Sequence, residues 1–324
     1  MPHAIRIHQT GGPEVLVWET VDLAAPAPGE ARVRHHAVGL NYIDVYHRTG
    51  LYPVPLPSGI GLEGAGVVEA VGEGVDEVRV GDRVAYAGGP IGAYAEVRNI
   101  PAHRLLRLPD GIAFETGAAM MLQGLTAAYL LRRTFRVQAG DAVLIHAAAG
   151  GVGLLATQWA KALGALVIGT VGSPAKAELA RAHGCDHVIN YSTENFTGRV
   201  REITGGEGVA VVYDGVGKDT FAGSLDSLRP MGMMVSYGNA SGPVPPLDLI
   251  QLSQKGSLFV TRPTLMNYTA KRADLVALGD ELFGVVGSGQ VRVEVHQSYA
   301  LQDAAQAHRD LEARKTTGST LLLP

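Results

Sequence analysis

The chain has 324 residues, with 27 Lys and Arg against 31 Asp and Glu and a formal net charge of -4. Its hydrophobic content of 46% and its 42 glycines favour a large core with many tight turns, and the length suits two domains of roughly 150 residues. The acidic balance argues against nucleic-acid binding. No apolar run reaches membrane-spanning length, and the first residues do not resemble a signal peptide. We therefore expect a cytoplasmic protein without nucleic-acid or membrane partners.

The first third of the chain is rich in short strands separated by Gly and Pro turns. The predicted strands are 4–8, 14–21, 31–38, 63–71 and 83–87, and one or two helices follow at 113–133.

An apolar run, a small-residue turn and a helix then follow one another at 142–163. Val143 to Ile145 suit a buried parallel strand. Gly150 and Gly153 fall at the turn and the helix start, and Ala147 stands where the usual dinucleotide fingerprint has its first Gly. Small residues let the backbone approach a pyrophosphate at the helix N-terminus. The segment predicts a dinucleotide site; the alternative is an ordinary strand–turn–helix corner.

The following strand, 165–171, indicates which dinucleotide binds. NAD-binding chains place an Asp or Glu near the end of this strand to hold the ribose 2′-hydroxyl. Here the residues after Val171 include no carboxylate, while Ser173 offers a hydroxyl and Lys176 a positive charge. This pattern favours NADP(H), whose 2′-phosphate accepts charge-assisted hydrogen bonds. Ser173 could equally cap a helix that starts at Pro174, with Lys176 in solvent; both interpretations can hold together.

Strands and helices alternate after residue 142, which predicts a doubly wound parallel sheet. The elements expected there are strands 142–147, 165–171, 187–190, 209–214 and 231–237, with helices 152–163, 174–182, 194–203 and 219–227. A mixed end follows, with helices 271–286 and 301–313 and strands 291–297 and 319–323. The lone cysteine, Cys185, excludes an intramolecular disulfide and a zinc site of several thiolates, and we expect it to be a packing residue.

Several stretches together resemble one known family over the whole chain. They include GLNYIDVYHRTGLYP at 39–53, LPSGIGLEGAGVV at 56–68, VGDRVAY at 80–86, LQGLTAAYLL at 122–131, HAAAGGVG at 146–153 and VVYDGVG at 211–217. The chain resembles the quinone oxidoreductase (zeta-crystallin-like) branch of the medium-chain dehydrogenase/reductase superfamily. The resemblance implies an α/β fold with a doubly wound parallel (Rossmann) sheet at 123–265 and a GroES-like, β-rich catalytic domain at 1–122 and 266–324. It also implies a homodimer.

The resemblance argues against a catalytic metal. Zinc-dependent relatives bind the metal through a Cys and a Gly-His-Glu segment, and these positions read Asn41 and Leu62-Glu63 here. Neither Asn nor Leu is a useful zinc ligand, so we expect none.

The resemblance also implies cofactor contacts on both sides of the nucleotide turn. Together with the residues found above, the expected NADPH-binding set is Asn41, Tyr42, Ile43, Asp44, Tyr46, Gln123, Thr126, Tyr129, Gly150, Gly151, Val152, Gly172, Ser173, Lys176, Tyr191, Val216, Gly238, Asn239, Ser241, Thr261, Arg262, Pro263 and Arg314.

Chemistry without a metal suits an acceptor that delocalises charge by itself. We expect reduction of quinones by hydride or electron transfer from the nicotinamide, with Asn41, Tyr46 and Tyr52 as catalytic residues that stack on the acceptor or donate to its oxygen. Alternatively, Asp44 caps a helix 45–49 and the tyrosines only pack. The alternative functions are NADPH-dependent reduction of conjugated enals, enones or enoyl thioesters, and non-catalytic NADPH binding of the crystallin kind.

Overall fold

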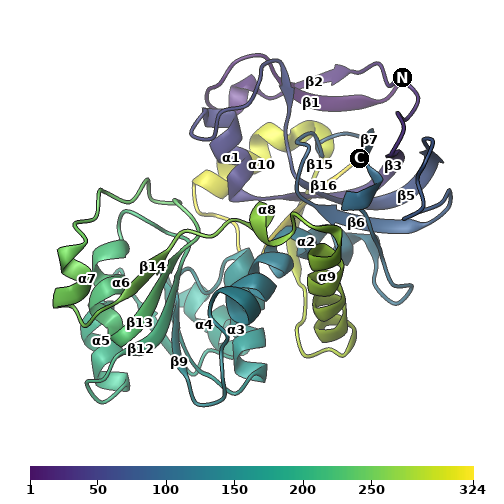
Figure 1. The fold of residues 1–324 in the computed structure, drawn as a ribbon. Helices are drawn as coiled ribbons and strands as arrows, with labels where there is room; N and C mark the ends of the chain where they lie inside the picture. The colour runs from purple at the N-terminus through teal and green to yellow at the C-terminus, as the bar shows by residue number, and fades with distance from the viewer. The chain divides into compact units, whose positions relative to one another are not determined.

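A computed structural model describes all residues, 1–324, and divides them into two compact units (Figure 1). The first, here called the barrel unit, comprises Met1–Leu125, Tyr268–Gly287 and Val293–Pro324. The second, the nucleotide unit, comprises Thr126–Asn267 and Ser288–Arg292.

The barrel unit is built on strands that pair antiparallel, except that β15 and β16 pair in parallel. They are β1 (His3–Ile7), β2 (Val17–Thr20), β3 (Glu30–Leu40), β4 (Ser58–Gly59), β5 (Glu63–Val71), β6 (Arg83–Ala87), β7 (Val97–Pro101), β8 (Leu106–Arg107), β15 (Val295–Ala300) and β16 (Ser319–Leu323). One sheet runs β2-β1-β4, and the other runs β15-β16-β3-β5-β6-β8 with β7 also on β3. The alternating pattern of β3 sends His35 into the interior and leaves His36 exposed, as expected for adjacent strand residues.

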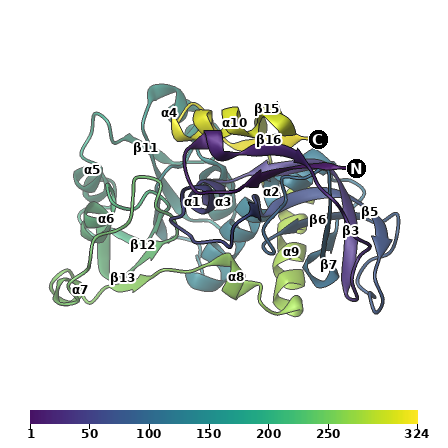
Figure 2. The ribbon, with the colours of Figure 1, turned by 90° about the horizontal axis from the view of Figure 1, so that it is seen from above.

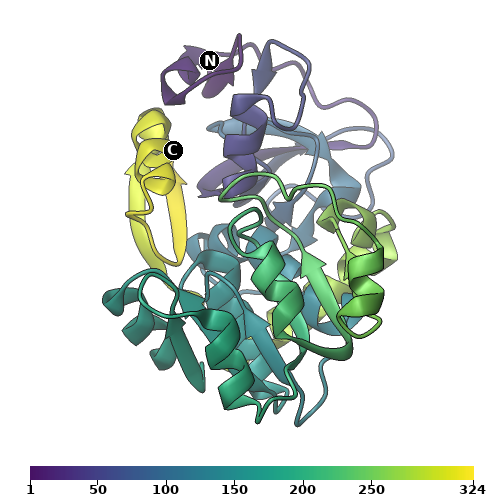
Figure 3. The ribbon, with the colours of Figure 1, turned by 90° about the vertical axis from the view of Figure 1, so that its left-hand side faces the viewer.

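Helices accompany these strands at several points of the chain. They are η1 (Pro13–Val15), α1 (Tyr42–Thr49), η2 (Ala102–Arg104), α9 (Arg272–Gly287), η4 (Leu301–Asp303) and α10 (Ala304–Glu312). Two further helices, α2 (Phe114–Tyr129) and α8 (Leu265–Tyr268), run across the boundary between the units. A π-helical turn, η3 (Leu130–Thr134), follows α2. The yellow C-terminal segment belongs to the same unit as the purple N-terminal strands (Figure 3), and one buried cluster includes Ile5, Val33, Leu301 and Leu322.

The nucleotide unit holds a six-stranded parallel sheet. Its strands are β9 (Ala142–Ile145), β10 (Leu166–Val171), β11 (His187–Asn190), β12 (Val209–Asp214), β13 (Leu228–Ser236) and β14 (Phe259–Thr261), in the order β11-β10-β9-β12-β13-β14. Its helices are α3 (Gly151–Ala162), α4 (Pro174–Ala182), α5 (Phe196–Ile203), α6 (Phe221–Ser227) and α7 (Ile250–Gln254). Figure 2 shows α5 and α6 on the opposite side of these strands from α3. The order reverses between β9 and β12, as in doubly wound dinucleotide-binding sheets.

Three predicted strands were wrong at their starts, and the one expected at 231–237 begins earlier, at Leu228. The strand expected at 14–21 begins only at Val17, because Pro13 cannot donate a backbone hydrogen bond and opens the turn η1 instead. The strand expected at 291–297 begins at Val295. The backbone of Arg292 is instead bound by the Gln158 amide, whose oxygen accepts from Arg292 N (2.9 Å) and whose nitrogen donates to Arg292 O (3.0 Å).

The expected helix 45–49 was also placed too late. Helix α1 begins at Tyr42 with Asn41 as its N-cap. Asp44 lies in the first turn, where it accepts a hydrogen bond from Asn41 N (2.9 Å), so it completes a capping box and does not itself precede the helix.

None of the helices combines the length and the apolar character that crossing a membrane requires.

Candidate functional site

The turn between β9 and α3 has the shape that the fingerprint predicts. Gly150 is the N-cap of α3, whose first turn holds no acidic side chain. A Cβ on Gly153 would lie 2.3 Å from Ala147 O and 2.8 Å from Ala148 Cα, so only Gly lets the helix start this close to the turn. Ala147 has a φ of 51°, the left-handed conformation for which the usual fingerprint has Gly. The first N–H groups of α3 have no partner within the helix, which is the property that allows a helix N-terminus to bind a phosphate.

A second group of predicted residues gathers at the end of β10. Ser173 is the N-cap of α4, and its hydroxyl accepts from Lys176 N (3.4 Å). A Cβ on Gly172 would lie 2.6 Å from the Tyr191 hydroxyl, so this ring packs against the bare backbone there. The structure thus brings the predicted residues Gly172, Ser173, Lys176 and Tyr191 together at the end of β10.

Two more loops at the same edge of the sheet are braced by side chains. Asp214, at the end of β12, accepts from Val216 N (2.8 Å) and Gly217 N (3.0 Å). The Ser241 hydroxyl donates to Val216 O (2.9 Å), and Arg262 donates to Gly238 O (3.2 Å). The predicted contacts Val216, Gly238 and Ser241 therefore belong to two adjoining loops, and Arg262, which follows β14, is hydrogen bonded to the second of them.

The sequence reasoning missed a buried cluster beneath these loops. His146 Nδ1 contacts Thr170 Oγ1 (2.8 Å), and its Nε2 contacts Ser224 Oγ (2.9 Å). The Ser224 hydroxyl in turn contacts Asp214 Oδ2 (3.1 Å). Burial lowers the pKa of His146, which keeps the ring neutral. A signal for this cluster was available in the sequence. Each of three predicted strands has a polar residue at or next to its last position, His146, Thr170 or Asp214, and parallel pairing places the ends of these strands side by side.

In the barrel unit, Asn41 and Glu63 form one buried polar cluster. Asn41 Nδ2 donates to Glu63 Oε2 (2.6 Å), and Asn41 Oδ1 accepts from Gln123 Nε2 (3.1 Å). Gln123 also accepts from the Ser319 hydroxyl (2.8 Å), and Glu63 Oε1 accepts from Leu122 N (2.7 Å). Burial raises the pKa of Glu63 to about 8.

This cluster occupies the positions where zinc-dependent relatives carry metal ligands. Asn41 and Glu63 bond to each other, and Leu62 offers no donor atom. Across the 324 residues, no three His, Cys, Asp or Glu side chains are grouped so as to hold a metal ion. The residues present therefore do not fit a zinc centre.

The aromatic residues expected to receive the acceptor lie together on α1 and the turn after it. The ring of Tyr46 is 5.5 Å from that of Tyr42 and 5.1 Å from that of Tyr52. Tyr46 is buried and Tyr52 is half-buried. Tyr52 N donates to Tyr46 O (3.0 Å), which ties the turn back onto the helix.

The remaining predicted contacts lie on separate elements. Thr126 and Tyr129 are buried on α2, whereas Arg314 follows α10 in the barrel unit with a φ of 58°. Cys185 is buried between α4 and β11, as expected of a packing residue, and burial raises the pKa of its thiol to about 11.

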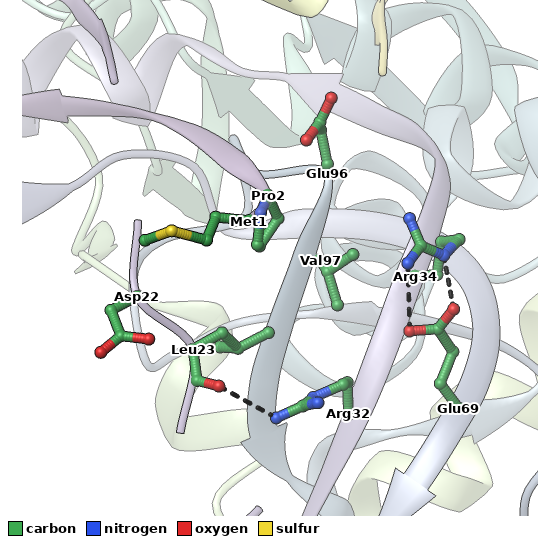
Figure 4. Close-up of a pocket in the computed structure, with 9 residues that line it drawn as sticks. All are labelled: Met1, Pro2, Asp22, Leu23, Arg32, Arg34, Glu69, Glu96 and Val97. Carbon is green, nitrogen blue, oxygen red and sulfur yellow. Dashed lines mark hydrogen bonds and ion pairs between the residues drawn. The ribbon is translucent and has the colours of Figure 1, made fainter. Parts of the chain in front are cut away.

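A hollow of about 450 Å³ lies elsewhere on the barrel unit (Figure 4). Its guanidinium groups are already engaged: Arg34 pairs with Glu69, and Arg32 donates to the carbonyl of Leu23. Its lining is charged rather than aromatic, so it does not suit a flat apolar acceptor.

Substitution of Gly153 tests the close approach at the nucleotide turn. In Gly153→Ala, the new methyl group meets backbone atoms that cannot yield without moving the turn. We expect the dissociation constant for NADPH to rise tenfold or more, measured by quenching of protein fluorescence. Gly284→Ala is the control, because a Cβ there meets nothing within 4 Å. An unchanged affinity in Gly153→Ala would contradict this geometry.

The raised pKa of Glu63 predicts a pH-dependent stability. Because the folded protein keeps the proton up to about pH 8, the stabilisation is full below the ordinary pKa of about 4.5 and is lost as the pH rises through 8. We expect Glu63→Gln to flatten the fall in the free energy of unfolding between pH 5 and 8, by up to about 1.4 kcal/mol per pH unit. Urea unfolding at a series of pH values measures this free energy. Glu69→Gln, on the exposed end of β5, should leave the slope unchanged.

Comparison with known proteins agrees with this architecture. Residues 27–110 match the alcohol dehydrogenase GroES-like domain, and residues 151–275 match the family described as zinc-binding dehydrogenase. A Pseudomonas aeruginosa protein named quinone oxidoreductase is 57% identical, with both chains fully covered. The crystal structure of Escherichia coli quinone oxidoreductase complexed with NADPH superposes with a TM-score of 0.98 at 51% identity, covering 99% of this chain and 100% of that one.

A Burkholderia protein named 2-haloacrylate reductase is 47% identical, over 100% of this chain and 99% of its own. The resemblance expected from the motifs is thus confirmed along the entire length, although the zinc ligands implied by one family description are missing here. The chain belongs to the quinone oxidoreductase family of medium-chain dehydrogenases/reductases.

Proposed function

We propose that this protein reduces quinones with NADPH and without zinc. The observation that carries the proposal is its full-length identity of 51–57% to quinone oxidoreductases. The nucleotide unit supports it, because the end of β10 has Ser173 and Lys176 and no carboxylate. When bound, NADPH supplies a hydride. A quinone accepts it without a Lewis acid, because its conjugated carbonyls delocalise the charge that arrives.

The barrel unit supplies the groups that this reaction needs. The aromatic faces of Tyr46 and Tyr52 suit stacking on a flat acceptor. Asn41 is held by Glu63 and Gln123 in a fixed orientation, so its amide is a preorganised donor for an acceptor oxygen or the nicotinamide ribose. The other residues of the expected NADPH-binding set keep that role as part of the proposal.

The function is tested by following NADPH oxidation with a panel of acceptors. The panel contains 1,4-naphthoquinone, 9,10-phenanthrenequinone, an enone, crotonyl-CoA and 2-chloroacrylate. We expect the quinones to be used with the highest kcat/KM, and EDTA to have no effect. Preference for 2-chloroacrylate or the enone would instead favour a conjugated-alkene reductase, the second candidate, which the similarity to 2-haloacrylate reductase supports. NADPH binding without turnover of any acceptor would favour a non-catalytic protein.

Lys176 should determine the preference for NADPH over NADH. Loss of a charged hydrogen bond to phosphate costs roughly 1.5–3 kcal/mol, so Lys176→Ala should raise the KM for NADPH tenfold or more while NADH use stays nearly unchanged. Lys161→Ala is the control, since Lys161 pairs with Asp186 instead. A wild-type enzyme that prefers NADH would contradict the assignment.

Tyr52 should act on the acceptor more than on NADPH. Tyr52→Ala removes stacking worth roughly 0.5–1.5 kcal/mol beyond the buried area, so kcat/KM for naphthoquinone should fall about three- to tenfold. Tyr52→Phe keeps the ring and removes the hydroxyl. A fall in kcat for Tyr52→Phe would assign proton donation to the hydroxyl, whereas wild-type kinetics would leave the stacking role alone. If Tyr46→Ala and Tyr52→Ala both behave like wild type, this segment does not receive the acceptor.

The protein is also proposed to be a homodimer that joins through β14. This strand lies at the edge of the six-stranded sheet, and Phe259 and Val260 on it are 57% and 37% exposed. An open edge with apolar side chains favours pairing with a second copy. Phe259→Lys should halve the mass seen by analytical ultracentrifugation, whereas Val17→Lys, at an exposed apolar site of the barrel unit, should not. We keep the expectation of a cytoplasmic location, which cell fractionation tests.

A further inference from the structure

A chain of buried side chains connects the first turn of α1 to the C-terminal helix α10, all within the barrel unit (Figure 1). The Tyr94 hydroxyl donates to Asp44 Oδ2 (2.9 Å) and contacts His308 Nε2 (3.1 Å). His308 Nδ1 lies 3.1 Å from Arg48 Nη1. Arg48 binds both oxygens of Glu312 at 2.9 Å. Asp44, Tyr94 and His308 have no exposed surface, and Arg48 is 1% exposed.

The chemistry of Arg48 fixes which group donates and which accepts in each of these hydrogen bonds. A guanidinium can only donate, so His308 Nδ1 accepts and Nε2 carries the ring proton. Nε2–H then donates to the Tyr94 oxygen, and Tyr94 donates its own proton to Asp44. Burial and the charge of Arg48 lower the pKa of His308 to about 3, in agreement with a neutral ring. Every proton between Arg48 and Asp44 is thereby placed.

The same order of donors and acceptors determines which oxygen of the Asp44 carboxyl group would carry a proton. Oδ2 accepts from both Asn41 N and Tyr94 (2.9 Å each), whereas Oδ1 has no partner. A proton on Asp44 therefore resides on Oδ1. Burial raises the pKa of Asp44 to about 7, and the hydrogen bonds from Asn41 and Tyr94 oppose this rise.

Four titratable or charged groups surround Asp44: Tyr94, His308, Arg48 and Glu63. Arg48 and Asp44 both lie on α1, one turn apart, and both are tied to partners outside the helix. The rotation of α1 about its own axis is therefore set by Tyr94 and by α10. Tyr46 lies between these two residues on the same helix.

We propose that Tyr94 and His308 are positioning residues for reduction of the acceptor, holding α1 through Asp44 and Arg48 so that Tyr46 and Asn41 are presented in one orientation. This inference rests on the proposed quinone reductase function. Neither residue needs to touch the acceptor. Through His308, the C-terminal helix α10 takes part in holding Tyr46 and Asn41 in place.

The test compares variants by three measurements. The infrared C=O band of protonated Asp44, identified by its loss in Asp44→Asn, is followed against pH. Naphthoquinone kcat/KM, the KM for NADPH and the melting temperature are measured in parallel. Tyr94→Phe removes one donor to Asp44, so the infrared titration should move to higher pH. Naphthoquinone kcat/KM should fall about tenfold. The KM for NADPH should rise by a smaller factor, because most of the expected NADPH-binding residues lie outside α1.

His308 is tested by a disruptive and a conservative change. His308→Leu should shift the titration in the same direction by less, whereas His308→Gln should restore both titration and kcat/KM, because its amide can accept from Arg48 and donate to Tyr94. Tyr299→Phe is the matched control, since Tyr299 also donates to an aspartate, Asp310 (3.0 Å), outside this chain.

A purely structural role would overturn the proposal. In that case Tyr94→Phe lowers the melting temperature but leaves the Asp44 titration and naphthoquinone kcat/KM as they are in Tyr299→Phe. If the wild type reduces no acceptor, the proposed function fails on its own. The infrared titration needs no turnover. It therefore shows independently whether Tyr94 and His308 affect the protonation of Asp44.

Discussion

The barrel unit depends on keeping one buried carboxyl, that of Glu63, hydrogen bonded. This side chain has no exposed surface, and an unsatisfied polar group in such a place costs several kcal/mol. Its partners come from separate parts of the chain: Asn41 before α1 and Leu122 in α2. Gly39 leaves the space, since a Cβ there would lie 2.3 Å from Glu63 Oε2. Asn41 and the start of α1 are held in place because these donors must converge on one carboxyl group.

The nucleotide unit solves the same problem with different residues. Asp214 is fully buried, and it receives backbone N–H groups from the following turn and hydroxyls from α6. His146 extends this network to β10 through Thr170. These buried polar groups lie next to the loops at the carboxyl edge of the sheet. Hydrogen bonds to Asp214 hold the turn after β12 in its conformation without any bound ligand. Such preorganisation reduces the conformational entropy that the loops would otherwise lose when a dinucleotide binds.

Most of the fold could be predicted where the evidence is local. The pair Ser173-Pro174 marks the start of α4, and the apolar runs of β5, β6, β11 and β12 have the predicted bounds. Two errors had local causes, Pro13 before β2 and the capping box at the start of α1, whereas a distant group decides where β15 begins. Nothing near residue 292 indicates that Gln158 will bind its backbone and delay β15.

The same distinction applies to the candidate site. The strand order places the ends of β9, β10 and β12 at one edge, so the phosphate turn and Ser173 could be anticipated from the motif. The buried partners of Asp44 could not, because Tyr94 and His308 are 214 residues apart in the chain. Their pairing depends on tertiary packing; a Cβ on Gly61, for example, would lie 2.3 Å from the Tyr94 ring. The local pattern of apolar and polar residues does not indicate such contacts.

The position of β16 has a consequence for how the protein is made. This strand, Ser319–Leu323, lies between β15 and β3 in the larger sheet of the barrel unit. During synthesis, β16 emerges from the ribosome after every other strand of the barrel unit and after the whole nucleotide unit. The nucleotide unit, nearly all of it one continuous stretch, is free to fold first. Until β16 emerges, the Val38–Leu40 end of β3 lacks its partner on one side, whereas β7 already pairs with Glu30–Arg34. An unpaired strand segment invites pairing with other chains. The emergence of β16 therefore closes the period in which the nascent barrel unit is most exposed to aggregation.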